Sequence, residues 1–133
     1  MQQLNRSELR KKIMTILYQI NIYNKNGIKY DIDEVIKEVV KIDNEFVKDM
    51  VYGVITHQKE IDKLANQHLN NWTIDRLGNT DQAILRMGIY ELMYTDTPDI
   101  VAINEAIELA KIYSDDSIRK MINASLDALY HSK

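Results

Sequence analysis

The chain has 133 residues, a formal net charge of −3 and no cysteine. A chain of this length can form one compact domain with its own core, and the lack of cysteine excludes disulfides and thiolate metal sites. No apolar run approaches the roughly 18 residues of a membrane-spanning helix, and the start carries no apolar signal region. We therefore expect one soluble, cytoplasmic domain over residues 1–133 that does not contact membranes.

Apolar residues recur at helical spacing through most of the chain, which predicts an all-α fold. The low numbers of glycine (4) and proline (1) disfavour a fold with many strands and tight turns. A first helix is predicted over residues 7–23, with Ser7 as its N-cap. A short second helix is expected to begin after Asp31 or Asp33, since either side chain can cap it.

A long third helix is expected to begin at Asp43 or Asn44, because one apolar stripe continues from there to Leu64. The segment 70–73 breaks this pattern, but it is too short and apolar to separate independent domains. The sequence therefore predicts a compact single domain of two three-helix halves, at about residues 1–70 and 71–133.

Three more helices are predicted in the second half, at residues 81–94, 98–113 and 115–130. Asn79 or Thr80 can cap the first of them, and Thr97 can cap the second, with Pro98 in its first turn. Ser114 can cap the third. The first of these helices is unusually apolar, so we expect it to be buried on most of its circumference.

Enzymatic chemistry finds no support in the sequence. The histidines His57, His68 and His131 are not spaced as metal ligands, and no glycine-rich loop follows a strand pattern. Glu105 and Glu108 can share a helix face, but two glutamates three residues apart more often form a solvated surface. We therefore predict no catalytic residue, no metal site, no cofactor and no enzymatic activity.

The first twelve residues are locally basic on an acidic protein. They contain Arg6, Arg10, Lys11 and Lys12 against the single acidic residue Glu8. A small RNA-contacting surface has such a cluster, but a cluster of four cations by itself more often belongs to a solvated helix start.

Four segments form a recognisable series in chain order: Arg6 and Arg10 followed by LYQ at 17–19, DQAILRMGIYEL at 81–92, VAINEAIELAK at 101–111, and KMINASLD at 120–127. Together they resemble the NusB family of bacterial transcription antitermination factors. The chain departs from the family pattern at Met121, where the family has an aromatic residue, and at Ala124, where it has glycine.

This resemblance implies an all-helical, non-enzymatic protein that binds the boxA element of nascent ribosomal RNA. The family does so together with NusE, a ribosomal small-subunit protein, and joins the antitermination complex on RNA polymerase. A few cations on an acidic protein give only modest and salt-sensitive affinity for RNA. We therefore expect a partner with additional contacts to raise that affinity.

The RNA-binding residues that we predict are Arg6, Arg10, Lys11, Tyr18, Arg86, Lys120 and Met121. Arg6 and Arg10 are four residues apart and share a helix face, where they can bind phosphates or stack under bases. Tyr18 is placed near the same azimuth as Arg10, and it either stacks on bases or packs in the core.

The remaining predicted RNA contacts carry alternatives. Arg86 lies in the most apolar helix, so it either forms an ion pair, with Asp81 or Glu91, or reaches a surface and binds RNA. The resemblance implies an RNA contact at Lys120, but Met121 cannot stack on a base as a phenyl ring does.

The apolar fourth helix and its flanks are the expected surface for the protein partner, at Asp81, Tyr90, Glu91 and Tyr94. Asn104 is expected to tie helices together by hydrogen bonds, and Glu105 to be partly solvated. Two alternatives stay open: a self-associating helical module that buries its RNA face in a homodimer, and a stand-alone relative of the domain fused to RNA cytosine methyltransferases.

Overall fold

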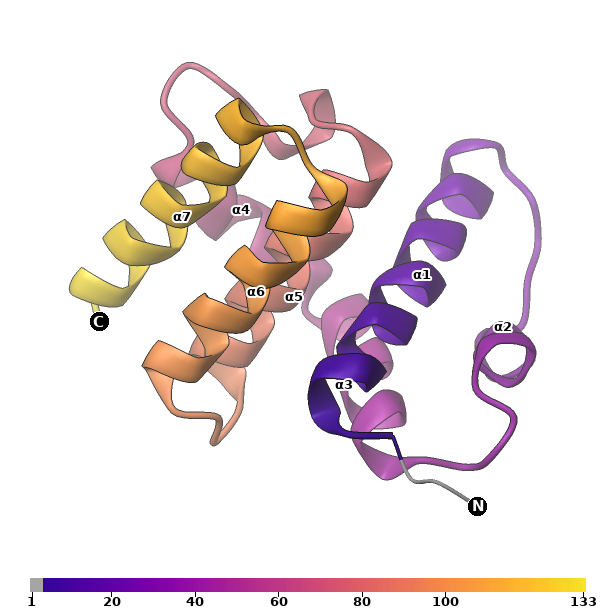
Figure 1. Ribbon diagram of the computed structural model, residues 1–133. Coiled ribbons are helices and arrows are strands. Elements are labelled where there is room, and N and C mark those ends of the chain that lie inside the picture. The colour runs from indigo at the N-terminus through magenta and orange to yellow at the C-terminus, as the bar shows by residue number, and fades with distance from the viewer. Residues whose placement is uncertain (1–3) are drawn as a thin grey trace.

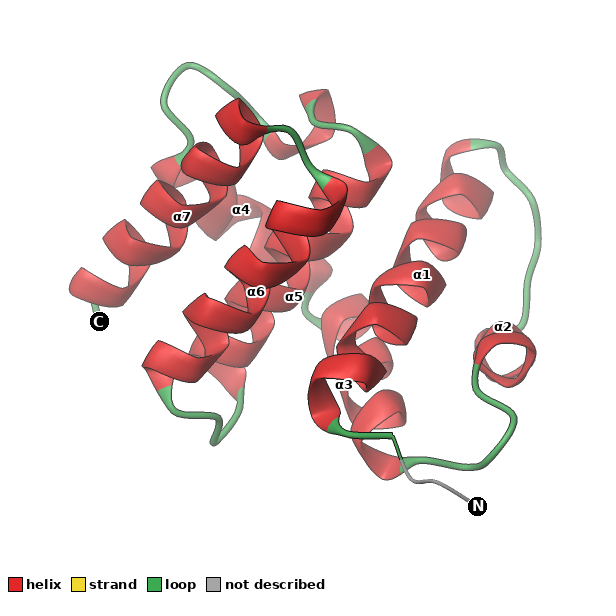
Figure 2. Cartoon of the chain, in the orientation of Figure 1, coloured by secondary structure: helices red, strands yellow, loops and turns green. Residues whose placement is uncertain are grey.

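The computed structural model describes residues 4–133 and confirms the all-α prediction (Figures 1 and 2). The described chain forms seven α-helices and one 3-10 turn: α1 (Arg6–Lys25), α2 (Ile32–Val39), α3 (Glu45–Thr56), α4 (Gln58–His68), η1 (Ile74–Arg76), α5 (Asn79–Tyr94), α6 (Asp99–Tyr113) and α7 (Asp116–His131). Within these residues no helix is both long and apolar enough to cross a membrane.

Short polar side chains start the helices of the first half. Asp31 caps α2 and Asn44 caps α3, each accepting a hydrogen bond from a backbone amide three residues later, so one of the two predicted candidates holds in each case. The cap predicted at Ser7 is wrong. Asn5 caps α1 instead, and the Ser7 hydroxyl donates to Glu105 at 2.8 Å.

The predicted long third helix is two helices, α3 and α4, which meet at His57. His57 has φ −101° and ψ 11°, and it ends α3 as it begins α4. The apolar stripe continues through this break because both helices bury one face. However, α3 packs on α1 and α5, whereas α4 packs on α5 and α7. The chain therefore groups as α1–α3 and α4–α7, which differs from the predicted three helices on each side of residue 70.

Helix starts in the second half also differ from those predicted. Gly78 precedes α5, and Asn79 already lies within it. Neither Thr97 nor Ser114 caps a helix: α6 follows Pro98 without a side-chain cap, and Asp115 caps α7. The hydroxyls of Thr97 and Ser114 instead donate to carboxylates of α5. The two side chains that the local sequence pattern predicts as caps therefore form tertiary hydrogen bonds to α5.

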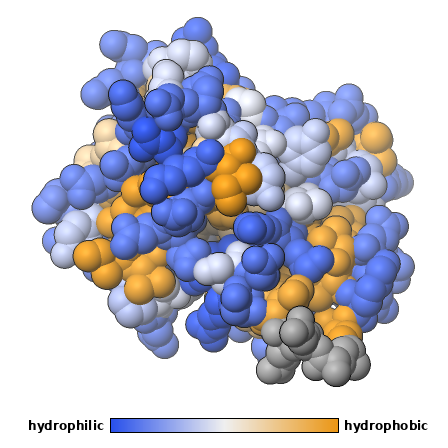
Figure 3. Space-filling model, in the orientation of Figure 1, coloured by the Kyte–Doolittle hydropathy of each residue, from blue (hydrophilic) through white to orange (hydrophobic). Residues whose placement is uncertain are grey.

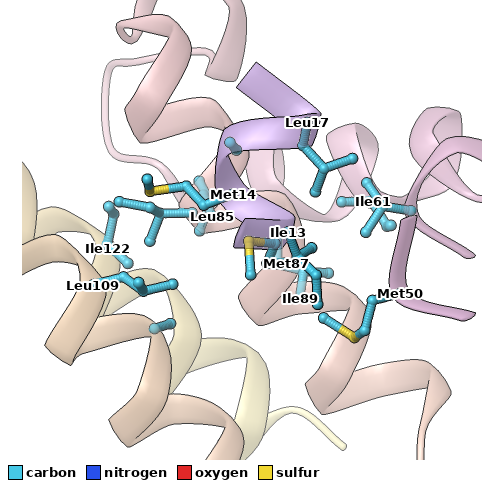
Figure 4. Close-up of a cluster of buried hydrophobic side chains, with 14 of the residues drawn as sticks. Ile13, Met14, Leu17, Met50, Ile61, Leu85, Met87, Ile89, Leu109 and Ile122 are labelled. Atoms are coloured by element: carbon cyan, nitrogen blue, oxygen red, sulfur yellow. The ribbon is translucent and has the colours of Figure 1, made fainter. Parts of the chain in front are cut away.

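Helix α5 is the centre of the molecule, as its apolar composition predicts, and it packs on α1, α3, α4, α6 and α7. The core around it draws side chains from every one of these helices (Figure 4), including Ile13, Met50, Ile61, Leu85, Leu109 and Ile122. At Gly88 the neighbouring helices come very close. A Cβ there would lie 3.0 Å from Leu126 and 3.1 Å from Ala106.

The surface is mainly hydrophilic on the face shown in Figure 3, and apolar side chains reach it in separate small patches. The most exposed large apolar side chains of the described chain are Ile100 and Ile42, at 70% and 60%. Single exposed apolar residues are normal on folded proteins, so these two positions alone do not mark an interface.

Candidate nucleic-acid and partner surfaces

The basic start of the chain is accessible at Arg6, which is exposed at the first turn of α1. Its guanidinium lies 4.5 Å from the ring centroid of Phe46 on α3, a cation–π contact that holds the charge near the surface. Lys11 and Lys12 are half-buried, and Lys11 lies 3.6 Å from Glu8. Residues 1–3, also part of the predicted basic segment, lie outside the described residues.

Arg10 does not share this exposure, and the expectation that it offers its charge to RNA is corrected by the structure. Its side chain is 3% exposed and makes two hydrogen bonds of 2.7 Å to the two carboxylate oxygens of Glu91 on α5. Burial disfavours the charged guanidinium, but the hydrogen bonds and charge of Glu91, together with the charge of Glu105, outweigh burial and raise the Arg10 pKa. Arg10 therefore joins α1 to α5.

Glu91 is likewise buried, at 2% exposure. The prediction that its carboxylate contacts a protein partner is therefore corrected. Besides Arg10 it accepts a hydrogen bond of 2.9 Å from the Thr97 hydroxyl. Glu105 lies 3.6 Å from Arg10 and is partly solvated, as expected. The expectation for Asn104 is wrong: its side chain is exposed, and no hydrogen bond from it to another described residue is present.

Tyr18 is 37% exposed, so its ring reaches the surface of α1. It does not share a face with Arg10, from which it is eight residues away, because eight residues at 100° each leave an offset of about 80°. Seven residues fall almost on the same azimuth, and Lys11 is seven residues before Tyr18. Lys11, Thr15 and Tyr18 thus form one outward line, which we call the outer face of α1.

Arg86 forms a structural ion pair, one of its two predicted roles, but neither predicted partner is the right one. Its guanidinium donates to both carboxylate oxygens of Asp62 on α4, at 2.8 and 3.0 Å, and also to the side-chain oxygen of Asn21 on α1, at 3.3 Å. With 7% exposure, Arg86 is occupied by these contacts. In the described chain every buried side-chain nitrogen or oxygen has a hydrogen-bond partner, so these interior charges are fully satisfied.

The two predicted RNA residues of α7 have different surroundings. Lys120 is exposed, whereas Met121 is half-buried and packs against the core. In Figure 1 helix α6 lies between α1 and α7. The predicted RNA contacts therefore fall into three locations: the start and outer face of α1, the interior, and the surface of α7.

Of the predicted partner residues, Tyr90 and Tyr94 form a surface feature at the end of α5. Tyr94 is 36% exposed, and the rings of Tyr90 and Tyr94 are stacked at 5.6 Å between centroids. His57, from the junction of α3 and α4, stacks on Tyr94 at 4.3 Å. Asp81 lies elsewhere, at the first turn of α5, where it accepts a hydrogen bond from Ser114.

Sequence reasoning missed the contribution of His57 and Gly53 to this feature. Gly53 and His57 are four residues apart on one side, as Tyr90 and Tyr94 are on the other, so each pair shares one helix face. This matching spacing was the signal available in the sequence. Only the packing of α3 on α5 shows that the two pairs face each other.

No group of three or more potential metal ligands converges within residues 4–133. The surfaces that remain accessible offer cations, tyrosines and carboxylates, which are side chains suited to recognising other molecules.

Comparison with known proteins gives matches along almost the whole chain. A curated relative from Halalkalibacterium halodurans, named transcription antitermination protein NusB, is 41% identical over 124 residues, covering 92% of this chain and 91% of its own. A protein of the same name from Campylobacter jejuni is 40% identical over 131 residues, covering 96% and 97%. These names agree with the expectation of a non-enzymatic transcription factor.

Solved structures agree with this comparison. The solved structure of T. maritima NusB superimposes with a TM-score of 0.83 at 27% identity, covering 98% of this chain and 93% of its own. A complex of the antitermination factors NusB and NusE with double-stranded RNA contains a chain with a TM-score of 0.80 at 29% identity, covering 96% and 97%. The NusB family model matches residues 7–131, and the chain belongs to the NusB family.

Proposed function

We propose that this chain is a cytoplasmic transcription antitermination factor that binds the boxA element of nascent ribosomal RNA together with NusE, within the antitermination complex on RNA polymerase. The observation that carries the proposal is the match along nearly the whole chain to a NusB that is solved with NusE and RNA. Identity of about 40% to named antitermination proteins over more than nine-tenths of the chain supports the same role.

The RNA surface that we propose is the start and outer face of α1, with Arg6, Lys11 and Tyr18 as its contacts. Arg6 and Lys11 supply cations for phosphates, and the exposed Tyr18 ring supplies a stacking surface for an unpaired base. Lys120 extends this surface only if the RNA passes over α6. Arg10 and Arg86 serve it indirectly, because their buried ion pairs fix α1 and α5 in place.

The test is the affinity of the protein for a labelled boxA RNA and a scrambled RNA, with and without NusE from the same organism, at two salt concentrations. Selective binding that NusE strengthens is the expected result. Equal binding of the two RNAs, or no binding under any condition, contradicts the proposal. Light scattering of the free protein over a concentration series then shows whether it self-associates.

Two variants locate the RNA on α1. Tyr18→Ala is expected to weaken binding by about fivefold or more, because stacking on an aromatic side chain contributes about 1–3 kcal/mol per base. Lys11→Gln is expected to reduce the slope of log K against log salt by about 0.7, the value of one phosphate contact to a single strand. Lys29→Gln, which removes an exposed charge from the loop after α1, is the matched control. An effect no larger than that of Lys29→Gln removes this face from the site.

A further inference from the structure

The aromatic stack formed by His57, Tyr90 and Tyr94 lies where α3 ends and α5 ends. The centroids of His57 and Tyr94 are 4.3 Å apart with an angle of 18° between ring planes, and those of Tyr90 and Tyr94 are 5.6 Å apart at 17°. The three ring planes are therefore nearly parallel. Tyr94 is 36% exposed, so at least one of the rings reaches solvent.

Gly53 makes this arrangement possible. A Cβ at this position would lie 2.1 Å from Cζ and from the hydroxyl oxygen of Tyr90, so any larger residue would push the Tyr90 ring away. The ring therefore lies directly on the backbone of α3. This contact fixes the innermost ring of the stack, and Tyr94 and His57 pack outward from it.

A surface hollow of about 460 Å³ opens beside the stack, and its rim is acidic. The stack and Gly53 line it, together with Asp49, Tyr52, Thr56, Thr95 and Asp96. Both Asp49 and Asp96 are exposed, and neither forms an ion pair with any residue between 4 and 133. The Tyr90 pKa is raised mainly by burial of its hydroxyl and, to a smaller extent, by the negative charge of Asp49. The Asp49 carboxylate is therefore close enough to interact with the stack.

Aromatic faces flanked by free carboxylates suit one chemical group best. A guanidinium is planar, stacks on aromatic rings and binds carboxylates through paired hydrogen bonds. RNA bases could also stack here, but two carboxylates at the rim repel the phosphates that any RNA segment brings. The surface therefore favours a protein ligand over a nucleic acid.

The position of the hollow also favours a protein partner that acts beside RNA. A second pocket, of about 600 Å³, shares Asp49, Tyr90 and Asp96 with it and continues to Arg6 at the start of α1. A molecule held by the stack would thus lie next to the basic segment, and its backbone could extend toward RNA bound there.

We infer that this hollow docks an arginine side chain from a basic segment of a protein partner, with its guanidinium stacked on the Tyr94–His57 end of the stack and paired with Asp49 or Asp96. The inference rests on the proposed function for the identity of that partner, NusE, but the chemistry of the site stands on the residues named. It deepens the predicted partner role of Tyr90 and Tyr94 by stating what they recognise.

The first experiment measures the affinity for NusE by calorimetry. Tyr94→Ala and the double variant Asp49→Asn/Asp96→Asn are each expected to weaken binding roughly threefold to thirtyfold, the range of a cation–π or charge-assisted contact at a partly exposed site. RNA binding by the isolated protein should not weaken in either variant, because neither removes a cation or ring of the proposed RNA surface. Affinities equal to that of the unaltered protein overturn the inference.

Matched controls come from other faces. Tyr130→Ala removes an exposed tyrosine that also packs on a histidine, His131, and Glu38→Gln neutralises an exposed carboxylate on α2. Neither should change the affinity for NusE. If these controls weaken binding as much as the variants of the hollow, the effect is general and the inference fails.

A second experiment separates this inference from the proposed function. The probes are the blocked peptide acetyl-Ala-Arg-Ala-amide and its lysine counterpart, followed through the ring signals of His57 and Tyr94 by NMR. Saturable shifts that are larger for arginine, and that are lost in Asp49→Asn/Asp96→Asn, support the inference even if NusE does not bind. If NusE does not bind and arginine gives no shift beyond that of lysine, both the partner and the docking site are refuted.

Discussion

Arg10 illustrates the limit of local sequence reasoning at the scale of one residue. Its spacing from Arg6 predicts a shared helix face, and both guanidiniums do lie near the Phe46 ring, at 4.5 and 5.2 Å. What the spacing could not predict is Glu91, which is 81 positions away and turns one of the two cations into an interior group. The residue type is the same, but its function depends on a partner supplied by the fold.

The Arg10–Glu91 pair gives a prediction for stability. Arg10→Ala should lower the free energy of unfolding by about 3 kcal/mol, because it leaves the Glu91 carboxylate buried without its cation. Arg6→Ala removes only an exposed cation–π contact and should cost less than about 1 kcal/mol. Urea unfolding measures both. Equal losses for the two variants would contradict the different roles assigned to these arginines.

Tyr52 gives a prediction for pH. Its hydroxyl donates a 2.6 Å hydrogen bond to Asp33, and this bond, with smaller effects of desolvation and of nearby carboxylate charge, raises the Tyr52 pKa to about 12. Because the folded pKa lies above the ordinary value of 10.0, the contact between α2 and α3 contributes fully below pH 10 and is lost as the pH rises toward 12.

Carbon-13 NMR of the tyrosine Cζ atoms can follow this ionisation. Asp33→Asn should bring the Tyr52 titration back toward pH 10, and Tyr52→Phe should identify its signal. A Tyr52 titration at the ordinary value of 10.0 in the unaltered protein would refute the assignment.

At the scale of the element, the type of each helix is legible from periodicity, but its limits are less so. The apolar stripe predicts helical structure on both sides of His57, yet it gives no sign of the break, because α3 and α4 bury the same side of the stripe against α5. Ser114 and Thr97 have the chemistry of caps, but their hydroxyls donate to carboxylates of α5, and neither residue caps the start of a helix. Competition with tertiary partners is invisible to a local pattern.

Helix α5 yields a prediction about packing. Gly88→Val should lower the free energy of unfolding by about 1–3 kcal/mol, since the added atoms collide with Leu126 and with the Cβ of Ala106, which cannot rotate away. Ala128→Val, on the exposed face of α7, is the control for the helix propensity of valine and should cost less than about 1 kcal/mol. Thermal or urea unfolding that ranks Ala128→Val as the more harmful change would contradict the close packing at Gly88.

At the scale of the whole molecule, the two groups of helices share one interior. Helix α1 packs on α5, and buried polar contacts cross between the groups: Arg10 with Glu91, and Asn21 with Gln82 and Arg86. Opening one group away from the other would expose apolar core and separate the buried Arg10 from Glu91. The two groups are therefore not separate domains, and we expect no independent stability in either group.

This expectation predicts a single unfolding transition. Trp72, which lies in the α4–α5 connection under the guanidinium of Arg76, reports on the second group by fluorescence, and far-ultraviolet circular dichroism reports on all helices. The two signals should change at the same urea concentration. Loss of helical signal before the fluorescence changes would show that α1–α3 unfold separately.

The contact of Tyr90 with the backbone at Gly53 also constrains how this sequence can vary. The two positions are 37 residues apart in the chain, but the residue at one restricts the residue at the other. A methyl group at position 53 would occupy space that the Tyr90 ring fills. A mutational library that changes one position at a time would record at Gly53 the cost of displacing the Tyr90 ring. Gly53→Ala should cost less once position 90 carries a shorter side chain. Among diverging descendants of this chain, positions 53 and 90 are therefore expected to covary.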